Sequence, residues 1–170
     1  MKSRAYAFGT AMAAVLALSP AAQAEDMVYG VLMKTLSNPF WGAMEEGVRD
    51  GAANAGVEYY LQAVESDQAA EPQLNTCETM LQRQPDVMIT AAINSTILLP
   101  CLSKATEMGI PVVDLDANLD HEIAKAAGVD IAFTIGSDNE AAGAQGADYL
   151  VGELGADATG PVLSLIHISE

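Results

Sequence analysis

The segment Ser37-Asn38-Pro39-Phe40-Trp41 lies between an apolar run at residues 27–33 and a helical pattern that begins at Trp41. A short apolar run of this kind is typical of a buried strand in a parallel sheet. The proline favours an extended Asn38 and suits the first helical position. Two interpretations of the aromatic pair are open. Phe40 and Trp41 either enter the core, or they hold a polar small molecule together with Asn38.

The helix predicted at residues 39–55 repeats small and apolar residues at helical spacing. These residues define its expected core face: Phe40, Met44, Gly47, Val48, Gly51, Ala52 and Ala55. Gly56 follows as a typical residue at a helix C-terminus. Because glycine weakens a helix, Gly47 and Gly51 indicate close packing against a sheet.

Short apolar runs alternate with helical patterns along the rest of the chain. The runs predict strands at residues 57–64, 87–93, 110–115 and 131–135. Helices are expected at residues 71–83, from a cap at 94–96 to residue 108, around 121–126, and from about 139 to 154. This alternation predicts an α/β fold, a parallel sheet with helices on both faces and right-handed connections.

The first 24 residues have the features of a cleaved signal peptide. Lys2 and Arg4 precede an apolar stretch at residues 5–18, and the small residues Ala22 and Ala24 precede a predicted cleavage site directly after Ala24. An uncleaved anchor is the alternative, but the stretch is shorter than the roughly 20 residues that span a bilayer. We therefore expect an exported, periplasmic protein that begins at Glu25.

The chain is strongly acidic, with 7 Lys and Arg against 23 Asp and Glu and a net charge of −16. Removing residues 1–24 leaves 5 basic residues (7 − 2) and a net charge of −18 (5 − 23). Such a surface repels phosphate backbones and anionic lipids. We expect no nucleic-acid partner and no membrane-surface role.

In a parallel sheet of this type, ligands bind beyond the carboxyl ends of the strands. The sequence places mostly polar residues there: Asn38, Phe40 and Trp41 after the first strand; Glu65, Ser66 and Asp67 after the second; Asn94 and Ser95 after the third; Asp116 and Asn118 after the fourth; Ser137 and Asp138 after the fifth. Polar side chains hydrogen-bond hydroxyl groups, while rings cover C–H surfaces. The set predicts a neutral, polyhydroxylated ligand. A phosphate is disfavoured, because no glycine-rich loop follows the first strand.

Catalytic motifs are missing from the sequence, which has no Gly-x-Ser-x-Gly, His-Glu-x-x-His or Cys-x-x-Cys. His121 is interpreted as a surface residue. Asp114 and Asp116 have the spacing of a metal pair, but alternate residues of any strand point the same way. We expect no metal, no cofactor and no enzymatic activity. An exported enzyme on a flavodoxin-like sheet is the alternative.

Two cysteines, Cys77 and Cys101, fall in the first turns of the second and third predicted helices. Consecutive helices on one face of the sheet would bring them to similar height, which is compatible with a disulfide in an exported protein. Two free buried thiols are the alternative.

A family resemblance extends over about residues 28–162. It rests on the signal peptide, on the segment at residues 37–41, on Ile110-Pro111-Val112-Val113 leading to Leu115-Asp116, and on Ile135-Gly136-Ser137-Asp138-Asn139 followed by Ala142-Gly143. These segments resemble the ribose/galactose-type periplasmic sugar-binding proteins, the substrate-binding components of bacterial ABC transporters. The resemblance implies a lobe of the periplasmic-binding-protein type 1 fold, in which two similar lobes close over a sugar.

The resemblance also implies ligand contacts. Phe40 and Trp41 would be the stacking platform, Asn38, Asp116 and Ser137 would bind hydroxyl groups, and Thr76 near the start of the second helix would contribute. Ribose-binding members carry an arginine directly after the aspartate of strand four, whereas Ala117 and then Asn118 follow here. This departure leaves another pentose, a hexose, a polyol or a furanosyl signal open as the ligand.

The implied partners are a sugar or polyol and the membrane permease of an ABC transporter. A chemoreceptor or sensor kinase is the alternative partner, because a ligand-binding protein for sensing has the same core. Lactose-repressor-type regulators share this core but begin with a helix-turn-helix, whereas this chain begins with an export signal.

Family members carry a second lobe that this chain lacks. We therefore expect residues 25–163 to form an N-terminal sugar-binding lobe. Residues 164–170 depart from the family pattern and are interpreted as a tail of doubtful origin.

Overall fold

The structure, a computed structural model, describes residues 27–116, 119–155, 157 and 159–160. The predicted signal peptide, Ala117, Asn118 and the tail at residues 164–170 lie outside the described residues. Within the described ranges, no helix is both long and apolar enough to cross a bilayer.

Strands and helices alternate along the described chain. In order they are β1 (Val28–Thr35), α1 (Pro39–Ala55), β2 (Glu58–Val64), α2 (Ala70–Leu81), β3 (Val87–Thr90), α3 (Leu99–Glu107), β4 (Val112–Leu115), α4 (His121–Ala126), β5 (Ile131–Ile135) and α5 (Asn139–Leu154). The predicted α/β alternation is confirmed, because each strand is followed by a helix.

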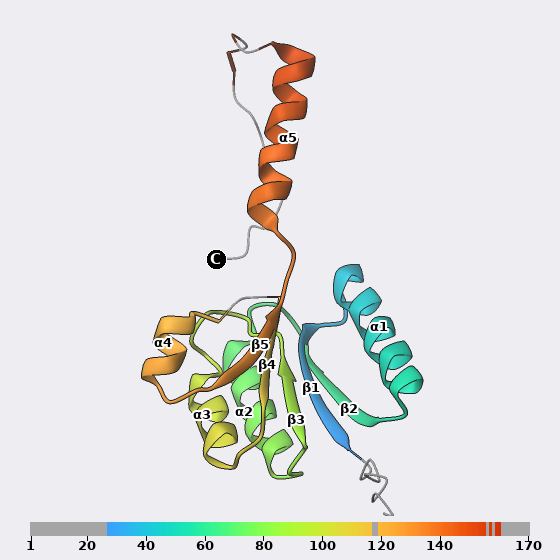
Figure 1. The fold of residues 1–170 in the computed structure, drawn as a ribbon, viewed down its shortest axis with the longest axis vertical. Helices are drawn as coiled ribbons and strands as arrows, with labels where there is room; N and C mark the ends of the chain where they lie inside the picture. The colour runs from blue at the N-terminus through green and yellow to red at the C-terminus, as the bar shows by residue number, and fades with distance from the viewer. Residues whose placement is uncertain (1–26, 117–118, 156, 158, 161–170) are drawn as a thin grey trace, which may run out of the picture.

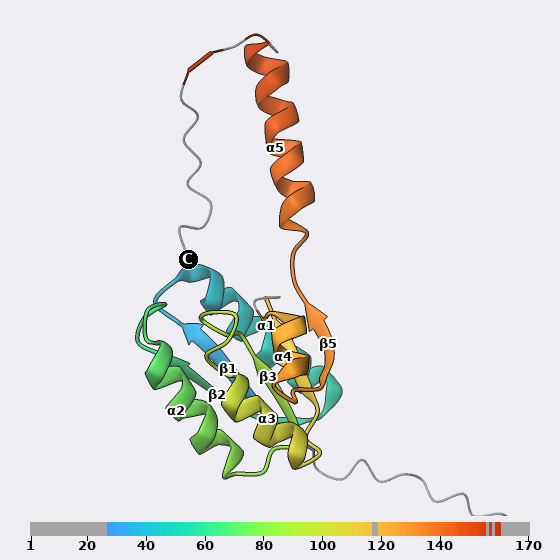
Figure 2. The ribbon, with the colours of Figure 1, turned by 90° about the vertical axis from the view of Figure 1, so that its left-hand side faces the viewer.

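The strands form one parallel sheet in the order β2-β1-β3-β4-β5. Helix α1 lies on one face, and α2, α3 and α4 lie on the other (Figures 1 and 2). After β2, successive strands are therefore added on the other side of β1. The prediction of a parallel sheet with helices on both faces is confirmed.

Strand β1 is buried on both faces, which explains its continuous apolar sequence. Leu32 faces the larger core under α2 and α3, whereas Val31 and Met33 face the smaller core under α1. Their alternation follows from the two-residue period of a strand. The strand continues two residues beyond the predicted run and ends with the buried Lys34 and Thr35.

The core face of α1 differs from the predicted one. Trp41 is only 3% exposed, while Phe40 is 46% exposed. A Cβ atom built on Gly47 or Gly51 would meet nothing within 4 Å, so the predicted close packing of these glycines is wrong. Met44, Val48 and Ala52 of the predicted face do turn towards the sheet, and Trp41 joins them in place of Phe40. The larger apolar surface of tryptophan explains this choice, because its burial contributes more than that of phenylalanine.

The boundary between β3 and α3 also differs from the prediction. Strand β3 ends at Thr90 rather than at residue 93, and α3 begins only at Leu99. The side-chain oxygen of Asn94 accepts hydrogen bonds from the N–H groups of Thr96 (3.1 Å) and Ile97 (2.8 Å). Asn94 therefore caps a turn ahead of the helix, as asparagine commonly does.

Helix α5 stands clear of the sheet in both views (Figures 1 and 2). None of its residues is buried, and Phe133 and Ile135 of β5 are 56% and 53% exposed. The sheet and the helices α1 to α4 therefore form the packed body of the described chain.

Helices α2 and α3 are joined by a disulfide between Cys77 and Cys101, whose Cα atoms are 6.2 Å apart. Both residues are fully buried in the larger core. The two helices lie side by side on the same face of the sheet (Figure 2), which is the arrangement that a bridge requires.

Replacing both Cys77 and Cys101 by alanine removes the link between positions 24 residues apart. We expect the free energy of unfolding to fall by about 3 kcal/mol, because a closed loop of this length restricts the unfolded chain. Denaturant unfolding followed by circular dichroism measures the change. Dithiothreitol should destabilise the unchanged protein and leave the double variant unaffected. Equal stability of both proteins under oxidising conditions would contradict a stabilising disulfide.

Candidate functional site

The candidate site lies at the carboxyl edge of the sheet, where β1 and β3 are neighbours. The connection from β1 leads outwards to β2, whereas the chain continues from β3 in the opposite direction to β4. Such a reversal of strand order leaves a crevice at the strand ends, because the two loops leave in opposite directions. The loops after β1, β3, β4 and β5 all reach this edge.

Asn38 closes the first of these loops and begins α1. Its backbone is extended (φ −87°, ψ 124°), as a residue before proline prefers, and its side-chain oxygen accepts a hydrogen bond from the N–H of Phe40 (3.0 Å). The carbonyl oxygen of the amide is therefore used by the helix cap. A ligand at this position would meet the NH₂ group.

The aromatic pair divides between the core and the edge. The rings of Phe40 and Trp41 meet at a centroid distance of 4.9 Å and an interplanar angle of 88°. Trp41 packs in the core with Val31, Met33 and Leu115, so the ring of Phe40 rests on a buried ring. Phe40 is the exposed member of the pair, at 46% against 3% for Trp41.

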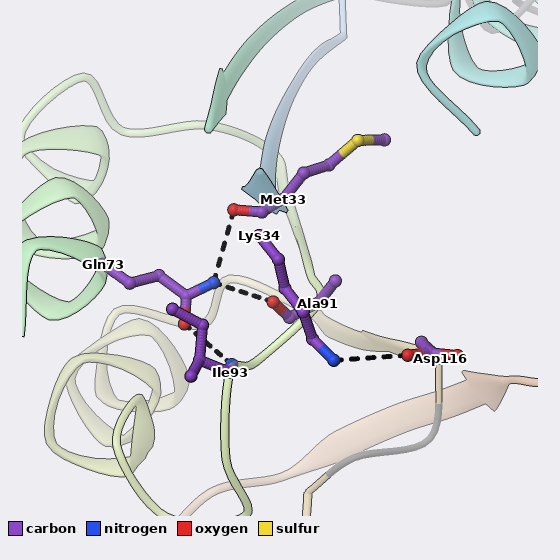
Figure 3. A network of polar contacts seen from close by, with 6 residues as sticks. All are labelled: Met33, Lys34, Gln73, Ala91, Ile93 and Asp116. Carbon is purple, nitrogen blue, oxygen red and sulfur yellow. Dashed lines mark hydrogen bonds and ion pairs between the residues drawn. The ribbon is translucent and has the colours of Figure 1, made fainter. Parts of the chain in front are cut away.

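Lys34 is a residue of this edge that the sequence analysis missed. It is 8% exposed, and its Nζ atom lies 3.4 Å from Oδ2 of Asp116 (Figure 3). The same Nζ atom lies 5.1 Å from the ring centre of Trp41, a distance at which a cation is attracted to the ring. A lysine directly after an apolar strand was the available indication, but the predicted strand stopped one residue earlier.

Asp116 has an unusual backbone conformation. Its φ of +70° lies in the left-handed region, where an aspartate is tolerated but most residues are strained. Its N–H donates a 2.7 Å hydrogen bond to the carbonyl of Ile135, which ties the end of β4 to the end of β5. Residues held in this region cluster at functional sites. The conformation fixes the carboxylate that meets Lys34.

The structure does not bring every predicted ligand residue to this edge. Ser137 lies beyond the end of β5 and is exposed, and Asn118 lies outside the described residues. Thr76 donates a hydrogen bond to the carbonyl of Pro72 (2.8 Å) and lines a groove of about 350 Å³ on the side of β2 and α2. The roles assigned to these residues stay predictions.

The groove at Thr76 is built around Tyr60 and Arg83. The guanidinium carbon of Arg83 lies 4.0 Å from the centre of the Tyr60 ring, and the Tyr60 hydroxyl donates to the carbonyl of Met80 (2.9 Å). Burial raises the pKa of Tyr60 above its usual value, and the nearby charge of Arg83 opposes part of that rise. These contacts join β2 to the C-terminal half of α2, at the end of the helix away from the ligand edge.

His121 contacts two side chains, but their arrangement is not that of a catalytic relay. Its Nε2 atom lies 3.0 Å from the hydroxyl of Thr134 and 3.6 Å from a carboxylate oxygen of the buried Asp114. A Ser-His-Asp type relay uses the two ring nitrogens for the two partners, whereas here one nitrogen serves both. Among the described residues, His, Cys, Asp and Glu form no cluster of three that could hold a metal ion.

Comparison with known proteins gives the family of this chain. A family model for the periplasmic binding protein domain matches residues 29–167. The D-allose-binding periplasmic protein of Escherichia coli is 34% identical over 152 residues, which are 89% of this chain and 48% of that protein. The D-ribose/D-allose-binding protein of Pseudomonas aeruginosa is 27% identical over 126 residues, which are 73% of this chain and 39% of that protein.

A solved structure agrees with these relatives. An ABC transporter periplasmic solute binding protein from Actinobacillus succinogenes with bound D-allose is 31% identical and superposes with a TM-score of 0.70, over 76% of this chain and 45% of that chain. This chain spans less than half the length of each of these three proteins. They are sugar-binding and transport proteins and not enzymes, which is consistent with the expected lack of enzymatic activity.

The family match runs from β1 past the end of α5, and the parallel sheet with helices on both faces superposes on solved members. This chain therefore belongs to the periplasmic binding protein domain family, and its sheet is that of a type 1 periplasmic-binding-protein lobe.

Proposed function

We propose that this chain forms the N-terminal lobe of an exported protein that binds a neutral sugar between two lobes and delivers it to the membrane permease of an ABC transporter. In this proposal residues 1–24 are removed as a signal peptide, residues 25–163 form the lobe, and the protein acts in the periplasm. The relatives named above support both the sugar and the transport role.

The observation that carries the proposal is an exposed ring and an ion pair that both contact Trp41. The ring of Phe40 and the ammonium of Lys34 both lie against the ring of Trp41, at centroid distances of 4.9 and 5.1 Å. Asp116 completes the group through Lys34. A pyranose needs these two kinds of contact, because it has apolar C–H faces and a polar rim of hydroxyl groups.

The charges of the pair favour an uncharged ligand. Lys34 supplies N–H donors and Asp116 supplies acceptor oxygens, while their charges compensate each other over 3.4 Å. A hydroxyl group both donates and accepts, so it can join this pair without adding charge. A phosphate or a carboxylate would compete with Asp116 for Lys34.

The chain has no arginine directly after Asp116, but another residue places a cation beside this carboxylate. Ribose-binding members place a cation at the position that Ala117 occupies here, whereas Lys34 of β1 brings a cation to Asp116 from a different strand. Asp116 therefore has a cation beside it although no arginine follows it in the chain. We infer D-allose as the first ligand to test and D-ribose as the second, as the relatives suggest.

The ligand is identified by thermal unfolding of the two-lobe protein in the presence of D-allose, D-ribose, other aldoses and polyols. A sugar that binds the folded state should raise Tm in proportion to the logarithm of its concentration once binding is saturated. A strain without the gene should lose uptake of the same sugar at low external concentration. Conversion of the sugar by the purified protein, or no change of Tm with any sugar or polyol, would contradict the proposal.

Replacing Asp116 by alanine should weaken sugar binding about 10- to 100-fold, because hydrogen bonds to charged groups contribute about 1.5–3 kcal/mol each. Alanine is also strained at the φ of +70°. Asp116→Asn is the matched control, since asparagine tolerates this conformation and keeps one side-chain oxygen. Isothermal calorimetry should rank the affinities as unchanged protein, Asn variant, Ala variant. Full affinity in the Ala variant would show that the sugar binds elsewhere.

Substitutions of Phe40 and Trp41 form a second pair of variants, one expected to change mainly sugar affinity and the other mainly stability. Phe40→Ala should weaken sugar binding about two- to tenfold, the magnitude of an aromatic contact, and change stability little because the ring is 46% exposed. Trp41→Ala should lower the free energy of unfolding by about 3 kcal/mol or more, since it empties a core position. Calorimetry and denaturant unfolding separate the two effects. A large loss of stability in the Phe40 variant without a loss of affinity would reverse the assignment.

A further inference from the structure

Gln73 of α2 lies where β1 and β3 separate, and the side chain is completely buried. The last paired residues of the two strands are Leu32 and Thr90, and the last ladder bond runs from the N–H of Ala91 to the carbonyl of Leu32 (2.8 Å). Beyond this rung the two strands share no further pairing among the described residues. The amide of Gln73 enters the space between them (Figure 3).

The amide of Gln73 makes three hydrogen bonds to the two strand ends. Its nitrogen donates to the carbonyls of Met33 (3.3 Å) and Ala91 (2.8 Å), and its oxygen accepts from the N–H of Ile93 (2.9 Å). A glutamine amide has two N–H donors and one oxygen, so both of its ends are in use. The side chain thus replaces the ladder bonds that the diverging strands cannot form.

No other side chain of similar size can make these three hydrogen bonds. Methionine has the shape but no donor. Glutamate at neutral pH would place an oxygen, in place of the NH₂ group, against the carbonyls of Met33 and Ala91. Buried main-chain groups without a partner are strongly unfavourable, so the strands would shift to regain partners or admit water. The position of the strand ends therefore depends on this amide.

The residue directly after Met33 is Lys34, whose ammonium reaches Asp116 across the edge. We propose that Gln73 is a positioning residue of the sugar site, which sets the place of Lys34 by fixing the end of β1 against the segment after β3. This inference rests on the proposed function, since the site is the one assigned to the sugar. Gln73 itself need not touch the ligand.

The test uses Gln73→Met in the two-lobe protein, alone and combined with Lys34→Met. Trp41, the single tryptophan of residues 1–170, lies against the Lys34 ammonium, so a difference in emission between variants reports a movement of Lys34 without any sugar. D-allose and D-ribose affinities are measured by calorimetry on the same proteins. Tyr60→Phe is the matched control, because it removes a side-chain hydrogen bond to α2 at the far end of that helix.

We expect Gln73→Met to shift the Trp41 emission and to weaken sugar binding about tenfold or more, the effect of losing buried hydrogen bonds at a site. Both effects should disappear when Lys34 is already methionine, because Gln73 acts through Lys34. Tyr60→Phe should change neither. A loss of affinity of the same factor in both Lys34 backgrounds would show a merely structural role and overturn the proposal, as would unchanged affinity.

Two further outcomes keep the proposal testable. If the unchanged protein binds no sugar, the proposed function is wrong, and the Trp41 emission alone decides whether Gln73 positions Lys34. If Gln73→Met does not fold, Gln73→Glu replaces it. When the glutamate of this variant is protonated, its O–H can donate to one carbonyl and its other oxygen can accept from the N–H of Ile93. The sugar affinity of the variant, relative to that of the unchanged protein, should therefore recover as the pH falls from 7 to 5. A constant ratio over this range would overturn the proposal.

Discussion

The end of the hydrogen-bond ladder between β1 and β3 is the constraint on which the site depends. Parallel strands share evenly spaced hydrogen bonds only while they stay side by side. After Leu32 and Thr90 this condition fails, and the main-chain carbonyls of Met33 and Ala91 need other donors. The Gln73 amide supplies them from α2, so the sheet can open at its carboxyl edge without leaving these groups unpaired. The separation of β1 and β3 at this edge is where the proposed function places the ligand.

Lys34 stands out in a chain with a net charge of −16. A nearly buried ammonium is unfavourable unless it is compensated, and Lys34 has both Asp116 and the face of Trp41. The side chains of the pair are only 10% and 21% exposed, so the free-energy cost of removing both charges from water offsets much of their attraction. The pair is thus a weak source of stability for the lobe alone. Its position at the edge fits the ligand-binding role that we propose for it.

The sequence predicted the architecture well because it depends on a pattern that local residues carry. Apolar runs and helical spacing alternate from β1 to α5, and both Asn38 and Gly56 mark the ends of α1 as helix caps do. The sequence did not determine which ring of the Phe40 and Trp41 pair faces the core, because neighbouring helical positions differ by 100° and both rings suit a core. The placement was decided by packing against Val31, Met33 and Leu115.

Lys34 and Gln73 were missed for a related reason. Lys34 follows an apolar run and Gln73 lies in a polar stretch at the start of α2, so neither differs locally from a surface residue. Their burial results from contacts with residues 82 and 18 to 40 positions away, which no local pattern contains. The disulfide was within reach of sequence reasoning because two cysteines in neighbouring helices allow only one pairing.

One lobe provides only one wall of the proposed cleft, and this affects how a sugar would control closure. An ammonium has three N–H donors, of which one carboxylate oxygen takes one, and the Asn38 oxygen is already used by the N–H of Phe40. In the proposed function, solvent water is the acceptor for the other N–H groups of Lys34 and Asn38 while the cleft is open. A second lobe that covered this edge without a ligand would remove that water and leave donors buried without acceptors, which is unfavourable. In the proposed two-lobe protein, sugar hydroxyls would supply the acceptors, and the exposed ring of Phe40 would lose its contact with water at the same time. A bound sugar should therefore favour closure, because the same donors that would hold the sugar oppose an empty closed state.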